Sequence, residues 1–193
     1  MARHKEFETA KAIEKARDLF WLQGYEATSI QDLVDHLGIS RSSLYDTFED
    51  KHSLFLLTLD QYVESTCSRV AAMYDQLGFS KATIEQSCKS LIDQVLSDDP
   101  RRGCFMVNST AELANCDAEI ASRANRMRVR TEDLFLQAVA NSQAAGEIST
   151  EQDPRALARF LYSAMQSIAV TVKTRPDRQV VEDIVNVTLS VLH

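Results

Sequence analysis

One hydroxyl-rich stretch holds the residues best suited to chemistry: Ser40, Arg41, Ser42, Ser43 and Tyr45. An arginine can donate two hydrogen bonds to the edge of a guanine, and hydroxyl groups can donate to phosphate oxygens. The stretch follows an amphipathic segment that stops at Gly38, which is the spacing of two short helices joined by a tight turn. The pattern therefore predicts a helix-turn-helix whose second helix enters the major groove of DNA.

Four flanking side chains are better placed for phosphate oxygens than for bases: Thr28, Ser29, Thr47 and Lys51. Lys51 begins the next predicted helix, so a shift of that helix would move its charge. Two alternatives stay open, since Arg41 could be a solvated surface residue and Tyr45 could be half-buried scaffold. Leu44 and Phe48 are assigned to packing.

Apolar periodicity predicts the helices that position these residues. One helix runs through Ala12–Phe20 and ends at Gly24, and a second, opened by a Thr28–Gln31 capping box, ends at Gly38. A short third helix follows the cap at Ser40, and Asp50 caps a fourth that runs to about Met73. Because this fourth helix is long, we expect it to connect two domains, 1–50 and 51–193.

The remainder predicts five more helices. They run from the cap at Ser80 to about Leu96, over Phe105–Leu113, from Asp117 to before Gly146, from Pro154 to Val172, and from the cap at Asp177 to Leu192. The expected fold class is all-α, with nine helices. The last two helices carry apolar residues on more than one stripe, which fits either the middle of a domain or a subunit interface. We favour an interface, because one short recognition helix contacts too few base pairs to specify a site.

The composition of the chain limits the classes of function that it can have. The chain has 193 residues, a net charge of −7, and only 5 glycines and 3 prolines, as expected for connected helices. Residues 1–60 hold seven Lys or Arg against eleven Asp or Glu, so phosphate contacts must come from a few placed groups. No apolar run of 18 residues exists, which predicts a cytoplasmic protein without a membrane partner.

Metal and catalytic sites are not predicted. The 4 cysteines include no CxxC pair, and three of the 4 histidines lie in the first 52 residues. We expect no metal and no cofactor. With no histidine between residues 53 and 192, and no Ser-His-Asp order or phosphate loop, the chain is not expected to be an enzyme.

The chain resembles the tetracycline-repressor (TetR/AcrR) family of bacterial transcriptional regulators. The match is the motif G-Y-x-x-T-S-I-x-x-L-V-x-x-L-G-I-S-R-S-S-L-Y-x-x-F-x-D-K-x-x-L-F over residues 24–55. A second stretch, RGCFMVNSTAELAN at 102–115, is similar to a G-C-x-x-V-N-x-x-x-E segment in one branch of the family. The resemblance implies an amino-terminal DNA-binding domain, a helical effector-binding domain and a homodimer formed by the last two helices.

These expectations together describe a homodimeric repressor that leaves its double-stranded DNA operator when a small molecule binds among the fourth to eighth helices. The candidate pocket residues are Leu91, Cys104, Phe105, Asn108, Glu112, Met127, Met165 and Lys173. Asn108 and Glu112 share a helix face with Cys104.

Cys104 also supports an alternative, a redox- or electrophile-sensing repressor. It follows Arg101 and Arg102 near a helix start, and both conditions favour a thiolate. Plain pocket lining is the other reading. Lys173 could pair with a thiol or extend outward. Arg123, Arg126 and Arg130 share a face that fits an anion site or, more simply, a solvated surface.

Overall fold

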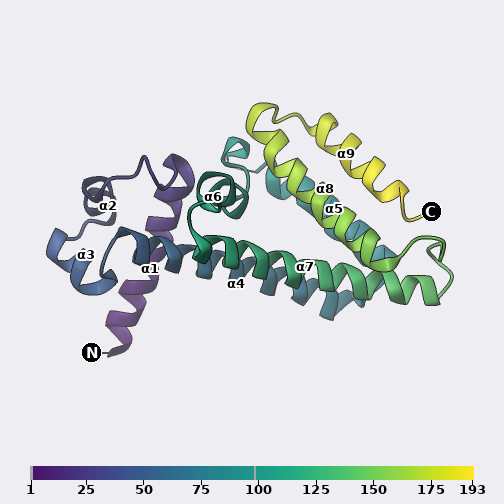
Figure 1. The fold of residues 1–193 in the computed structure, drawn as a ribbon, viewed down its shortest axis with the longest axis horizontal. Coiled ribbons are helices and arrows are strands. Elements are labelled where there is room, and N and C mark those ends of the chain that lie inside the picture. The colour runs from purple at the N-terminus through teal and green to yellow at the C-terminus, as the bar shows by residue number, and fades with distance from the viewer. Residues whose placement is uncertain (1, 98) are drawn as a thin grey trace.

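The computed structural model describes residues 2–97 and 99–193, and within them it is all-helical, with nine α-helices (Figure 1). Their bounds are α1 Ala2–Gln23, α2 Ile30–Leu37, α3 Arg41–Phe48, α4 Lys51–Leu77, α5 Lys81–Val95, α6 Phe105–Leu113, α7 Ala118–Ala144, α8 Pro154–Thr174 and α9 Arg178–Ser190. A short 3₁₀ turn, η1, covers Pro100–Arg102. The predicted fold class is confirmed.

The helices begin where side-chain oxygens can accept the first free backbone N–H groups. The caps at Ser40, Asp50, Ser80, Asp153 and Asp177 are confirmed. Asp117 likewise caps α7. Several bounds differ from expectation: α1 begins at Ala2, α4 continues four residues past Met73, α8 ends at Thr174 and α9 ends at Ser190.

The capping box of α2 was predicted one residue too early. Ser29, not Thr28, is the N-cap, and its hydroxyl oxygen accepts from the backbone N–H of Asp32 at 3.1 Å. The Asp32 carboxylate in turn accepts from the Ser29 N–H at 2.8 Å. Hydrogen bonds from the Ser29 side chain and backbone hold the pKa of Asp32 below its usual value.

Figure 1 shows two regions along a common axis. We call α1–α3 the head and α4–α9 the body. The long helices α4 and α7 run side by side, and α6 lies between the head and α8. One hydrophobic cluster joins the head to the near ends of α4, α6 and α7, while a second fills the far end around α5, α7, α8 and α9. The head therefore shares its core with the body.

The link between α3 and α4 is a strained γ-turn. Asp50 donates its N–H to the carbonyl of Phe48 at 2.8 Å, across Glu49. Glu49 adopts φ 68° and ψ −61°, and it is the one described residue other than glycine with positive φ. A side chain in this region costs of order 1–3 kcal/mol. The connection from the third helix to the fourth is thus short and stiff.

Glycine at position 49 would relieve this strain. We expect Glu49→Gly to raise the free energy of unfolding by about 1 kcal/mol, because the relief exceeds the roughly 0.5–1 kcal/mol that glycine's backbone entropy costs. Glu49→Ala is the matched control, since it removes the carboxylate but keeps the Cβ. Urea unfolding of both variants checks this, and equal stabilities would show that the turn stores no strain.

Candidate DNA-binding head and effector site

The recognition helix α3 turns nearly all of its side chains outward. Leu44 and Phe48 are buried against α2 and α4, as predicted, and the other residues of the helix are exposed. Arg41, Tyr45 and Thr47 are thus exposed on a short helix and accessible to DNA. Their contacts with DNA remain predictions.

The start of α3 is a cluster of hydroxyl groups. Ser40 accepts from the N–H of Ser43 at 3.1 Å, and its oxygen lies 2.9 Å from that of Ser42 and 2.8 Å from that of Ser43. These exposed groups stand beside the free N–H groups of the first turn, which carry the positive end of the helix dipole. The arrangement suits a phosphate or a base edge.

The prediction that Thr28 contacts phosphate is wrong, because its side chain is fully buried. Its hydroxyl donates to the carbonyl of Gly24 at 2.6 Å and so closes the turn between α1 and α2. Ser29 is exposed, and its side chain is bonded to Asp32.

Lys51 also makes contacts within the protein that its position in the sequence did not predict. Its ammonium donates to the carbonyls of Tyr25 and Thr28, each at 2.9 Å, and lies 4.1 Å from the centre of the Tyr25 ring. A half-buried ammonium engaged in this way holds the α1–α2 turn. The contact of Lys51 with phosphate stays a prediction, because an ammonium has three donors and these two hydrogen bonds leave one of them for a further acceptor.

Glu112 does not belong to an interior pocket, and this prediction is wrong. Its carboxylate reaches the head, where it accepts from the N–H of Tyr25 at 3.2 Å and from the N–H of Glu26 at 2.9 Å. The α1–α2 turn is therefore held by a carboxylate from α6 and by an ammonium from α4. Nothing in the local sequence marks this pairing, because the partners lie 86 and 87 residues apart.

The remaining pocket candidates divide between the two cores. Phe105 and Met127 are buried in the cluster nearer the head, while Leu91 and Met165 pack against the other. Cys104 is half-buried, with its sulfur 3.2 Å from the hydroxyl oxygen of Tyr62.

Asn108 and Lys173 contact each other outside this interior. Lys173 is exposed and donates to Asn108 Oδ1 at 2.9 Å, so it takes the outward course rather than pairing with a thiol. Asn108 donates in turn to the carbonyl of Arg102 at 2.8 Å.

Sequence reasoning missed two interior tyrosines. Burial, followed by the neighbouring Cys104, raises the pKa of Tyr62 well above its usual value. Burial raises the pKa of Tyr162 to about 12, and this phenol bonds to Gln166. Nearby, Glu132 is buried and accepts two hydrogen bonds from Arg128, at 2.9 and 2.8 Å. Polar groups from α4, α7 and α8 thus stand partly or fully buried in the body.

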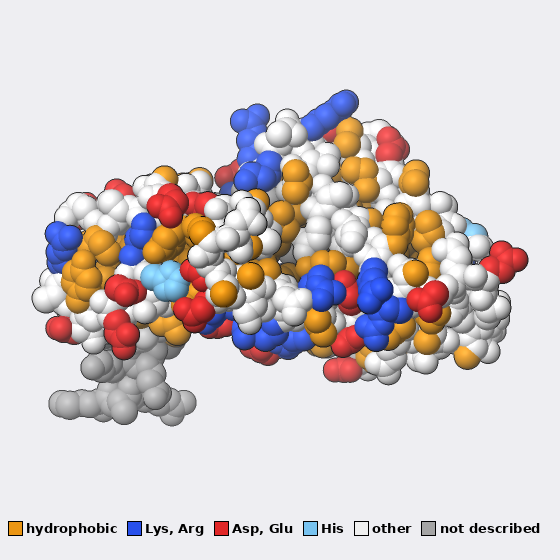
Figure 2. Space-filling view, in the orientation of Figure 1, with side chains coloured by type: hydrophobic (Ala, Val, Ile, Leu, Met, Phe, Trp, Pro, Cys, Tyr) orange, Lys and Arg blue, Asp and Glu red, His pale blue; other side chains and the backbone are white. Residues whose placement is uncertain are grey.

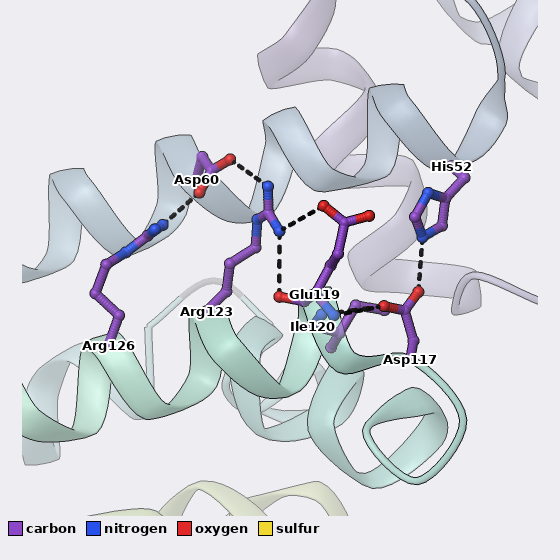
Figure 3. Close-up of polar contacts among 7 residues, drawn as sticks. All are labelled: His52, Asp60, Asp117, Glu119, Ile120, Arg123 and Arg126. Atoms are coloured by element: carbon purple, nitrogen blue, oxygen red, sulfur yellow. Dashed lines mark hydrogen bonds and ion pairs between the residues drawn. The ribbon is translucent and has the colours of Figure 1, made fainter.

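Ion pairs tie α4 to α7 (Figure 3). Asp60 lies between Arg123 and Arg126, and Arg123 is 2.9 Å from its carboxylate. Arg130 pairs with Glu64 at 2.7 Å, and hydrogen bonds from Arg130 and Ser68 lower the pKa of Glu64 to about 2. The three arginines are therefore paired with Asp60 and Glu64 of α4 and, in the case of Arg123, also with Glu119 of α7, which argues against a second anion site.

His52 joins the first turn of α4 to the start of α7. Its Nε2 lies 2.6 Å from Asp117 Oδ2 (Figure 3). Burial would raise the pKa of Asp117, but hydrogen bonds from His52 and the α7 backbone outweigh it and hold that pKa below its usual value. A surface hollow of about 290 Å³ opens near these pairs, lined by residues such as Thr47, Phe48, Leu56 and Arg123.

Within the described part of the chain, no group of three or more His, Cys, Asp or Glu residues could hold a metal ion. None of the helices that the structure describes is long and apolar enough to span a membrane.

The head and its exposed α3 define a helix-turn-helix DNA-binding regulator with an all-helical body. Comparison with known proteins identifies the family. Residues 12–58 match the bacterial regulatory proteins of the tetR family, and residues 81–187 match the tetracyclin repressor-like C-terminal domain. The chain belongs to the tetR family of transcriptional regulators.

Individual relatives agree with this assignment. The chain is 35% identical over the full length of both proteins to an uncharacterized HTH-type transcriptional regulator, YezE, of Bacillus subtilis. It is 31% identical to the HTH-type transcriptional repressor ComR of Escherichia coli, over 97% of this chain and 90% of ComR. Its fold matches CifR, a TetR-family regulator solved with a 26-base-pair operator, with TM-score 0.78, 24% identity, and coverage of 93% and 94%.

Proposed function

We propose that this regulator is a homodimeric repressor whose two α3 helices occupy an operator and leave it when a small molecule binds inside the body. The observation that carries the proposal is a recognition helix that is exposed except for its two packing residues. The repressor ComR and the operator complex of CifR support the same reading. We propose no catalytic role and, because the proposed partner is operator DNA, we place the protein in the cytoplasm.

The proposed contacts come from Ser29, Ser40, Arg41, Ser42, Ser43, Tyr45 and Thr47. We divide the chain after residue 50, so that α4 opens the effector-binding domain and carries its movement to the head through the stiff γ-turn. The proposed effector site lies around Cys104, Phe105, Met127 and Met165, with the newly found phenols of Tyr62 and Tyr162. A ligand that prefers the released conformation a hundredfold supplies about 2.7 kcal/mol toward release.

Arg41 gives the sharpest test of DNA recognition. On a duplex selected by the wild-type protein from a random library, Arg41→Ala should lose about 1–3 kcal/mol of binding free energy, or roughly 5- to 150-fold in affinity. Arg175→Ala is the matched control, because this arginine is 70% exposed and lies at the end of α8, outside the head. Fluorescence anisotropy measures both, and equal losses would contradict base recognition by α3.

The dimer is proposed to form through α8 and α9, where apolar side chains remain uncovered in the single chain. Phe160, Val170 and Val187 are 46%, 54% and 68% exposed. Figure 2 shows hydrophobic side chains along α8 on the face turned to the viewer. Uncovered apolar surface of this kind is typical of subunit interfaces.

Charges on this surface should therefore separate the subunits. We expect the double variant Phe160→Glu, Val187→Glu to run as a monomer at micromolar concentration and to lose at least tenfold in operator affinity. Leu77→Glu, an exposed apolar residue of α4, is the control. Sedimentation velocity gives the mass, and a dimer of unchanged affinity would place the interface elsewhere.

Effector release is tested through the interior phenols. A compound that dissociates the wild-type complex is first found by screening small molecules against the selected duplex. Tyr162→Phe should then need at least tenfold more of that compound for release, while its affinity for DNA stays within about twofold, because the phenol lies in the body. Tyr45→Phe is the control, since it should weaken DNA binding and leave the concentration of compound needed for release unchanged. Release of both variants at the wild-type concentration would remove Tyr162 from the site.

A further inference from the structure

The segment from Arg102 to Glu112 touches the head at both of its ends and touches α8 near its beginning. At the Glu112 end, the carboxylate holds two consecutive N–H groups of the α1–α2 turn. Gly24 makes this approach possible, since a Cβ there would lie 3.1 Å from Glu112 Oε2 and the residue has φ +87°. The contact is therefore close and specific to this turn.

At the other end, the segment is in contact with α8 through backbone and side chain. A Cβ on Gly103, which has φ +62°, would come within 2.7 Å of the carbonyl oxygen of Ala169. Asn108 accepts from Lys173 of α8 and donates to the carbonyl of Arg102. Any displacement of α8 therefore acts directly on the beginning of α6.

A third contact ties the same segment to α1. The carbonyl of Arg102 accepts from the indole N–H of Trp21 at 3.0 Å, and the Arg102 guanidinium lies 4.6 Å from the centre of the Trp21 ring. One peptide carbonyl thus receives hydrogen bonds from the head and from α6. The segment is bound at several points along its length.

The spacing of these contacts makes α6 a short rigid link. Asn108 and Glu112 are one helical turn apart, which is about 6 Å along the axis. A hydrogen bond of 2.9 Å is lost once its atoms part to about 3.6 Å, so a displacement below 1 Å at α6 releases the N–H of Glu26. Figure 1 shows α6 between the head and α8, so that such a displacement has a direct path through α6.

We propose that Glu112 is a positioning residue of the DNA-binding head, and that residues 102–112 transmit movements of α8 to the α1–α2 turn. This route runs beside the one through α4, whose Lys51 holds the carbonyls of the same turn. The part that concerns operator affinity rests on the proposed function, whereas the mechanical coupling does not require DNA.

The positioning role is tested by amide hydrogen exchange of the full-length protein, followed by NMR at Tyr25 and Glu26. Glu112→Ala should accelerate exchange of these two amides at least tenfold. In Glu112→Gln, whose amide oxygen still accepts hydrogen bonds, the exchange rates should lie between those of Glu112→Ala and the wild type. This variant also provides the test if Glu112→Ala fails to fold. The control is Glu119→Gln, a carboxylate that is 60% exposed at the start of α7. Unchanged exchange in both Glu112 variants would overturn the role.

Transmission is tested by a double-mutant cycle that needs no effector. Asn108→Ala cuts the link to Lys173 and should accelerate exchange of the Tyr25 and Glu26 amides at least threefold. In a Glu112→Ala background it should add nothing. Additive effects, or no effect of Asn108→Ala alone, would overturn transmission through α6.

Measurements of operator binding distinguish a failure of this inference from a failure of the proposed function. On the duplex selected by the wild type, Glu112→Ala should bind about tenfold more weakly with an unchanged dimer mass, and Glu112→Gln should recover part of that loss. Wild-type affinity in both variants would overturn the positioning role in DNA binding. Failure of the wild type to select any duplex would instead overturn the proposed function, while the exchange data would still decide the coupling.

Discussion

The turn between α1 and α2 is the constraint on which the placement of the head depends. Its N–H groups at Tyr25 and Glu26 face the carboxylate of Glu112, and its carbonyls at Tyr25 and Thr28 face the ammonium of Lys51. The negative carboxylate faces the positive N–H ends of the peptide dipoles, and the positive ammonium faces their negative carbonyl ends. Hydrogen bonds to charged groups are stronger than those between neutral groups. Because the two side chains come from different helices of the body, the orientation of the head follows the relative positions of α4 and α6.

Aromatic packing continues this connection into the core. Phe55 of α4 lies 5.0 Å from Phe20 of α1 and 5.8 Å from Phe105 of α6, measured between ring centres. Tyr62 contacts both Trp21 and Phe105 in the same cluster, and its hydroxyl meets Cys104. A ligand that displaced the Tyr62 phenol would therefore disturb side chains that also pack against the head. The proposed effector site therefore adjoins the hydrophobic cluster that joins the head to the body, and small shifts are passed on through a close-packed core.

Sequence reasoning succeeded where a feature depends on neighbours along the chain. Helix starts at Ser40, Asp50 and Asp153 follow from oxygen-bearing caps, and the inward positions of Leu44 and Phe48 follow from helical periodicity. It failed by one residue at Thr28 and Ser29, because both hydroxyl groups fit a cap and only the path of the turn distinguishes them.

The amino-acid sequence by itself determined the nine helices of the described residues, the helix-turn-helix and the family, since these rest on short-range periodicity, capping and a contiguous motif. Only the tertiary structure decided that Lys51 and Glu112 both hold the α1–α2 turn, which their positions in the sequence did not predict. It also decided that Tyr62, Cys104 and Tyr162 lie near one another. The physical reason is that a long charged or aromatic side chain can reach several neighbours, and the packing angles of the helices choose among them.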